Sequence, residues 1–143
     1  MGGFLDFMIG KIGNINKKEG LEIYVFSEET KVGYLILNNF ELSLEVHSDN
    51  LEILESIDNP IFNYNNSIFL RNFNVLENYQ GKGYGKGLLN HAIEESKKYK
   101  VDYLFLTCKI DNTVAKNLYE KFGFIKYASS KTDDLLYKKI PQD

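Results

Sequence analysis

The chain has 143 residues and a formal net charge of −3, with 43% hydrophobic and 26% charged residues. This composition is typical of a globular protein, and the length favours a single domain over residues 1–143 with a sizeable core. The acidic balance argues against a nucleic-acid partner held by general phosphate attraction. The single cysteine, Cys108, excludes an intramolecular disulfide and leaves no cysteine cluster for zinc, so we expect no metal site.

The N-terminal region begins with an apolar run over residues 4–9 that could form a strand or a short buried helix. The run lacks a basic flank and is too short to cross a membrane, so we expect a cytoplasmic protein without a membrane partner. Gly10, Gly13, Asn14 and Asn16 are expected to break whatever structure follows.

Four elements are expected between this region and the centre of the chain. Residues 21–26 alternate in polarity as a strand, and after a turn residues 32–37 form the returning strand. Residues 41–47 predict a third, half-buried strand with one solvated face. Residues 51–57 predict a short helix that ends before Asn59-Pro60.

The central stretch is an apolar, β-rich run over residues 68–75, followed by closely spaced glycines and an amphipathic segment. The glycines are Gly81, Gly83, Gly85 and Gly87. This order predicts a strand, a glycine turn and a helix, with backbone N–H groups gathered where the helix starts. Such a turn is expected to bind phosphate, with Lys82 and Lys86 as nearby cations, although a plain glycine connection between strand and helix is the alternative. The glycine spacing fits neither a P-loop nor a dinucleotide-binding turn.

Helices and strands alternate in the last third of the chain. Residues 102–107 form a continuous apolar strand, which we expect to pair in parallel with the central strand through the intervening helix. Residues 113–121 predict a helix that Asp111 or Asn112 caps. Residues 124–128 and 135–140 are expected to close the sheet as a hairpin. The fold class is therefore α/β, with a mixed sheet and some α+β character.

Two motifs resemble one known family. The spacing Gln80-x-x-Gly83-x-Gly85 resembles the pyrophosphate motif Q/R-x-x-G-x-G/A of the GCN5-related N-acetyltransferases (GNAT). A second block is similar to the family's N-x-x-A-x-x-L-Y-x-x-x-G-F signature. It comprises Asn112, Ala115, Leu118, Tyr119, Gly123 and Phe124. The resemblance covers residues 68–127, in which both motifs occur in the expected order.

The resemblance implies a GNAT-like fold and an N-acetyltransferase that uses acetyl-CoA (coenzyme A) as cofactor. The acetyl group would move to a primary amine by direct attack through a tetrahedral intermediate. Tyr119 would protonate the leaving thiolate, although a tyrosine on an apolar helix face also fits a core role. Asn112 would bind the cofactor arm or cap its helix. The implied cofactor-binding residues are Phe73, Asn74, Val75, Gln80, Gly81, Lys82, Gly83, Tyr84, Gly85, Lys86 and Asn112.

Several points stay open at this stage. The acceptor can be a small-molecule amine or an amine of a protein or peptide. No general base is singled out among Glu41, Glu45, His47 and Glu77. The region before residue 21 is too short and glycine-rich for the two helices that the family usually places there, and an exposed edge strand would permit a homodimer. The alternative function is a non-catalytic domain of the same fold that binds an acyl-CoA as a sensor.

Overall fold

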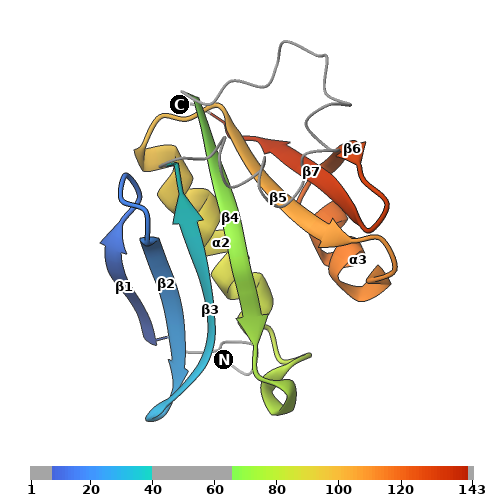
Figure 1. The fold of residues 1–143 in the computed structure, drawn as a ribbon. Coiled ribbons are helices and arrows are strands. Elements are labelled where there is room, and N and C mark those ends of the chain that lie inside the picture. The colour runs from blue at the N-terminus through green and yellow to red at the C-terminus, as the bar shows by residue number, and fades with distance from the viewer. Residues whose placement is uncertain (1–7, 40–65, 142–143) are drawn as a thin grey trace.

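The computed structural model describes residues 8–39 and 66–141. Their strands form one seven-stranded sheet in the order β1-β2-β3-β4-β5-β7-β6 (Figure 1). The strands are β1 Met8–Asn14, β2 Gly20–Ser27, β3 Thr30–Asn38, β4 Ser67–Val75, β5 Tyr103–Lys109, β6 Ile125–Ser129 and β7 Asp133–Lys139. The helical elements are the 3-10 turn η2 Glu77–Tyr79, α2 Tyr84–Lys98 and α3 Thr113–Lys121.

The sheet is mixed, and its single parallel pairing within these ranges is the one between β4 and β5. The α2 helix crosses from β4 to β5, which confirms the parallel connection expected from the strand–helix–strand order. The hairpin β6–β7 is also confirmed, but β7 lies between β5 and β6. The start of β7 is therefore next to the end of β5.

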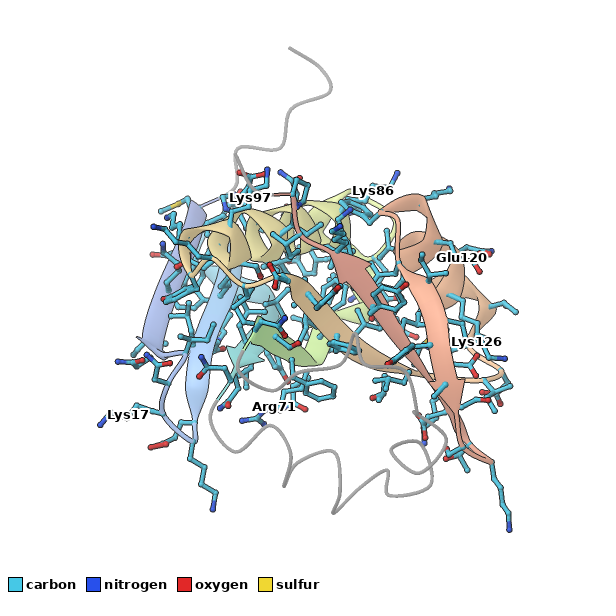
Figure 2. All side chains as sticks on the ribbon, turned by 90° about the horizontal axis from the view of Figure 1, so that it is seen from above. Lys17, Arg71, Lys86, Lys97, Glu120 and Lys126 are labelled. Carbon is cyan, nitrogen blue, oxygen red and sulfur yellow. The ribbon has the colours of Figure 1, made fainter. Side chains whose placement is uncertain are left out.

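The main core lies between the sheet and its two helices. Leu88, Leu89 and Ala92 of α2 are fully buried against the sheet. A smaller core of four residues, Phe69, Phe105, Ala128 and Leu135, lies on the other face of the sheet. Figure 2 shows α2 on one side of the sheet and Arg71 on the opposite side.

The two predicted N-terminal strands are confirmed as β2 and β3, whereas the expected break at Gly10 and Gly13 is wrong. The β1 strand runs through both glycines because it pairs with β2 along its whole length. The Tyr24 ring occupies the space beside Gly10, where an added Cβ would lie 2.3 Å from it. Residues 15–19 join β1 to β2 directly, so no helix separates them, as expected.

Other expectations fall partly or wholly outside the described residues. The predicted strand 41–47, the helix 51–57 and the Asn59-Pro60 stop lie outside them. Among the described strands β1 is at an edge of the sheet, and its Met8 and Ile12 are exposed. The predicted homodimer is compatible with this edge and stays a prediction. Neither helix of the described part is long and apolar enough to cross a membrane.

The glycine turn is shorter than the sequence indicated. The α2 helix begins at Tyr84, so Gly85 and Gly87 belong to its first turn. Glycine weakens the interior of a helix, but it is tolerated in the first turn, where the backbone N–H groups make no hydrogen bond within the helix. The predicted helix 113–121 is confirmed residue for residue as α3.

Candidate active site

The site begins where two parallel strands separate. β4 and β5 pair only at Ser67–Tyr103, Ile68–Leu104 and Phe69–Phe105. Beyond these pairs β4 continues to Val75 and β5 continues to Lys109, but the two strands no longer pair with each other (Figure 1). The two strands form a fork at their carboxyl ends, and backbone groups of β4 face the opening.

A bulge in β4 lies at this fork. Asn72 has φ 56°, and the register with β3 shifts opposite it, between Tyr34 and Ile36. Asparagine is among the residues that tolerate positive φ, and a bulge bends its strand and increases the local twist. Sequence reasoning missed this bulge, because an asparagine inside an apolar run does not by itself predict one.

Hydrogen bonds show which way the end of β4 faces. The Leu76 N–H donates to the Val32 carbonyl of β3 at 2.8 Å. Since bonding direction alternates along a strand, the N–H and carbonyl of Val75 point away from β3 and toward the fork. The Gln80 Nε2 donates to that Val75 carbonyl at 2.9 Å, which agrees with this direction. The Val75 N–H is thus left facing the opening.

The glycine turn places further N–H groups at the same opening. Gly81 has φ 78° and Gly83, the N-cap of α2, has φ 97°. The helix's first four-residue bond runs from the Gly87 N–H to the Gly83 carbonyl at 3.0 Å. The N–H groups of Gly85 and Lys86 precede that bond and have no acceptor within the helix. This end of α2 can therefore bind an anion.

The α3 helix forms the opposite wall. Asn112 caps it, with its side-chain oxygen accepting a hydrogen bond from the Ala115 N–H at 3.2 Å. Tyr119 is 7% exposed, and its ring centre lies 6.2 Å from that of Phe73 and 5.8 Å from that of Phe124. Burial raises the pKa of the Tyr119 phenol well above its ordinary value, and the neighbouring Cys108 raises it further. Within the described ranges its hydroxyl makes no hydrogen bond.

Three adjoining cavities follow the fork from the glycine turn to the far face of the sheet. We name them the outer, middle and inner cavities, with volumes of about 410, 550 and 430 Å³. The outer and middle cavities share Gly81, Gly85, Val114 and Leu118. The middle and inner cavities share Phe73, Asn112, Ala115 and Tyr119. Together they make one continuous groove between the two walls.

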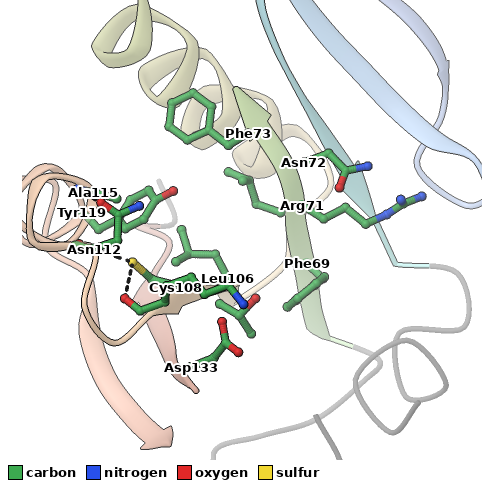
Figure 3. A pocket seen from close by; sticks show the side chains of 13 residues that line it. Phe69, Arg71, Asn72, Phe73, Leu106, Cys108, Asn112, Ala115, Tyr119 and Asp133 are labelled. Atoms are coloured by element: carbon green, nitrogen blue, oxygen red, sulfur yellow. Dashed lines mark hydrogen bonds between the residues drawn. The ribbon is translucent and has the colours of Figure 1, made fainter. Parts of the chain in front are cut away.

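The inner cavity reaches both faces of the sheet. Its helix-side lining includes Cys108, Asn112 and Tyr119, and Figure 3 shows Asn112 and Tyr119 across from Phe73 and Phe69 of β4. Burial raises the pKa of the Cys108 thiol, so this thiol stays protonated near neutral pH. The lining also includes Thr107, Lys109 and Asp133. They alternate with Leu106, Cys108 and Asp134, which face the helices, so they lie on the opposite face.

Most of the expected site residues come together in these cavities. Phe73, Asn74, Val75, Gln80, Gly81, Gly85, Asn112 and Tyr119 line the middle cavity, and Gly83 and Lys86 join the lining of the outer one. Lys82 and Tyr84 line none of the three. The Lys82 amine lies 5.7 Å from the centre of the Tyr79 ring, and Tyr84 is buried in the core at 8% exposure.

The candidate general bases differ in whether they line the three cavities. Glu41, Glu45 and His47 lie outside the described residues. Glu77 opens η2, where its carbonyl accepts a hydrogen bond from the Gln80 N–H at 3.2 Å, and it lines none of the three cavities. Asp133 does line the inner cavity and was missed, because only the placement of β7 beside β5 brings it there. No group of three or more His, Cys, Asp or Glu residues in residues 8–39 and 66–141 could hold a metal.

Comparison with known proteins agrees with this geometry. The model of the acetyltransferase (GNAT) family matches residues 12–124. A spermine/spermidine N(1)-acetyltransferase of Bacillus subtilis is 38% identical over 63 residues, which are 43% of this chain and 41% of that protein. The [ribosomal protein bS18]-alanine N-acetyltransferase of Escherichia coli is 42% identical over 55 residues, which are 38% of this chain and 37% of that protein.

The fold also matches solved structures. The PaiA N-acetyltransferase from Thermoplasma acidophilum, crystallised with coenzyme A, superposes with a TM-score of 0.62 at 21% identity. The superposition covers 82% of this chain and 59% of that one. The chain therefore spans about two fifths of its curated relatives' length in sequence, while the fold match extends over most of its own length.

Proposed function

Because the chain belongs to the acetyltransferase (GNAT) family, we propose that it moves an acetyl group from acetyl-CoA to a primary amine. The amine nitrogen attacks the thioester carbonyl carbon directly, the carbon–sulfur bond breaks, and the released thiolate takes up a proton. The observation that carries the proposal is the β4–β5 fork, with the glycine turn at one end and Tyr119 facing it.

The outer cavity is the proposed site for the pyrophosphate. The N–H groups of Gly85 and Lys86 are free of helical acceptors, and the positive end of the α2 dipole adds to their attraction for an anion. The outer lining also contributes the cations Lys86 and Lys121. A cofactor carrying phosphates therefore meets hydrogen-bond donors and positive charge at this end of the groove.

The exposed backbone of β4 is the proposed track for the pantetheine arm. Phe73, Asn74 and Val75 line the middle cavity, and the Val75 N–H faces the fork. An amide of the arm can pair with β4 in the way that a neighbouring strand would. At the end of this track the Val75 N–H is placed to donate to the thioester oxygen as negative charge develops there.

Tyr119 is the proposed acid. Its raised pKa keeps the phenol protonated at neutral pH, so the hydroxyl has a proton to donate. The side chain lines both the middle and inner cavities, at the point where the arm would end. The proton that Tyr119 gives to the thiolate is replaced from solvent through the open groove.

Calorimetry tests cofactor binding. We expect saturable one-site binding of acetyl-CoA by the purified protein, and no binding of ATP or NAD under the same conditions. Binding of ATP at least as tight as that of acetyl-CoA would instead indicate a general nucleotide site. Absence of acetyl-CoA binding would overturn the proposal.

Tyr119→Phe separates an enzyme from an acyl-CoA sensor of the same fold. The substitution removes only the hydroxyl and keeps the ring contacts with Phe73 and Phe124. We expect kcat to fall by about 10²-fold, the lower end of the usual general-acid contribution, while acetyl-CoA affinity is unchanged. A wild-type protein that binds acetyl-CoA but releases no thiol with any amine would favour the sensor.

A further inference from the structure

We propose that Asp133 binds the reactive amine of the acceptor, and that the acceptor is a singly charged α-amine of a peptide rather than a polyamine. This inference rests on the proposed acetyltransferase function. It concerns the inner cavity, at the face of the sheet opposite the helices, where the acceptor can approach the fork without crossing the cofactor groove.

Asp133 lines this cavity on the sheet face opposite to that of Tyr119. It is the first residue of β7 and pairs with Lys109, the last residue of β5. Its neighbour Asp134 faces the helices, where its carboxylate lies 2.8 Å from the Lys116 amine. Alternation therefore turns Asp133 to the opposite face, and Figure 3 shows its carboxylate pointing into the cavity. An amine bound there would lie on the sheet face opposite to that of Tyr119, and both would border the same cavity.

The hairpin turn holds the Asp133 carboxylate in place. The Thr132 hydroxyl donates to Asp133 Oδ2 at 2.6 Å. The Asp133 N–H donates to the Ser130 hydroxyl at 3.1 Å, and the Ser130 N–H donates to the Asp133 carbonyl at 2.8 Å. Within the described residues the second carboxylate oxygen, Oδ1, has no hydrogen-bond partner. A pre-oriented carboxylate with one oxygen available is a suitable acceptor for an N–H of an amine.

The charge of the cavity favours one positive charge on the acceptor. Asp133 is the only acidic residue among the described ones that line the inner cavity. Lys109 shares its face, and its repulsion grows with each positive charge that an acceptor carries. Arg71 also lines this cavity, and its guanidinium extends away from Asp133 and donates to the Lys18 and Glu19 carbonyls at 3.3 and 3.4 Å (Figure 3). A polyamine would place several ammonium groups where the described lining offers a single carboxylate, so a single amine fits this part of the site better.

The chemistry of an α-amine suits the same site. A peptide α-amine has a pKa of about 7.7–8.0, whereas a lysine side chain has one of about 10.4. An α-amine is therefore partly neutral near physiological pH and can attack once it is oriented, and its proton passes to water during the reaction. A carboxylate that accepts a hydrogen bond from the amine is enough for that task.

Steady-state kinetics with a panel of acceptors tests the assignment. The panel holds short peptides with a free α-amine, the same peptides with a blocked α-amine and one lysine, and spermidine. We expect the free α-amine peptides to have the highest kcat/KM in the wild type. We expect Asp133→Asn to raise the acceptor KM at least tenfold and to leave the acetyl-CoA KM unchanged.

Matched variants make the test specific. Asp111→Asn is the control, because it is the same change at an exposed residue that lines none of the three cavities. Asp133→Glu should restore part of the acceptor affinity, which a purely structural role would not predict. Lys109→Glu should lower the KM for spermidine, since it replaces a repelling cation with a second carboxylate.

The outcomes are distinguishable. An acceptor KM for Asp133→Asn equal to that of Asp111→Asn would overturn the role of Asp133. A wild-type preference for spermidine, or acetyl-CoA binding without acetylation of any α-amine peptide, would overturn the α-amine assignment. Failure of acetyl-CoA to bind would instead overturn the proposed function itself.

Discussion

The side-chain amide of Gln80 donates a hydrogen bond to the main-chain carbonyl of Val75 at 2.9 Å, and so joins the glycine turn to the end of β4. The Val75 carbonyl needs this partner because β4 has already separated from β5 at that point. One contact therefore links the proposed pyrophosphate site to the strand that carries the proposed pantetheine track.

Removing this donor should loosen the turn. Gln80→Leu keeps the size of the side chain but loses the amide, and we expect the acetyl-CoA KM to rise about tenfold, which corresponds to the ~1.4 kcal/mol that such a contact contributes when it orders a binding loop. The kcat should change little, because Tyr119 is untouched. Steady-state kinetics at varied acetyl-CoA measures both constants. Gln80→Arg, which keeps a donor, is the control, and equal KM values for the two variants would contradict the prediction.

Burial of Tyr119 should make stability depend on alkaline pH. Its pKa is raised in the folded protein, so the folded state holds the phenolic proton more tightly than the unfolded state. The stabilisation is fully present below the ordinary phenol pKa of about 10 and is lost as the pH rises toward the folded value. Urea unfolding of the wild type and Tyr119→Phe between pH 8 and 11 measures the difference. We expect the wild type to lose stability relative to the variant above pH ~10, and a difference that stays constant over this range would be evidence against it.

Alanine substitutions at Gly83 and Gly85 should change the stability of the protein in opposite directions. Gly83 has φ 97°, so Gly83→Ala forces an alanine into the left-handed region at a cost of about 1–2 kcal/mol. Gly85 lies in the helix, and an added Cβ would meet its nearest neighbours at 3.6 to 3.9 Å, which is ordinary contact. Gly85→Ala should therefore stabilise the protein by about 0.4–1 kcal/mol, because alanine restricts the unfolded chain. Thermal unfolding of both variants tests this, and a loss of stability in Gly85→Ala would show that the space is smaller than described.

The sequence predicted the elements whose signals are local. The helix 113–121 was found in full because its apolar face, its asparagine cap and Gly123 all indicate the same bounds. The parallel pairing of β4 and β5 followed from the crossover helix between them. The two motifs indicate the family through their residue spacing, and both lie next to or on these well-predicted elements.

The features that were missed depend on distant parts of the chain. Gly10 predicts a break from the sequence alone, but in the structure it continues β1 because the Tyr24 ring of β2 needs the space beside it. The bulge at Asn72 appears only through the register with β3. Asp133 enters the site because β7 inserts between β5 and β6, an arrangement that the order of elements does not reveal. The acceptor side of the site is therefore harder to predict than the cofactor side.

Asn112 allows a final test, because it was expected either to cap α3 or to bind the cofactor arm. Its side-chain oxygen caps the helix, while the residue also lines the middle and inner cavities. Asn112→Ala should cost about 1 kcal/mol of stability through the lost cap. Asn112→Ser keeps a cap of similar strength but lacks the amide N–H₂ group, so its stability should match that of the wild type.

The two roles then separate in one pair of measurements. We expect Asn112→Ser to unfold in urea at the wild-type midpoint and to bind acetyl-CoA about three- to tenfold more weakly by calorimetry, since one neutral hydrogen bond contributes ~1 kcal/mol. That result would assign the amide nitrogen to the cofactor arm and the oxygen to the helix. Wild-type affinity in the serine variant would leave Asn112 with the capping role alone.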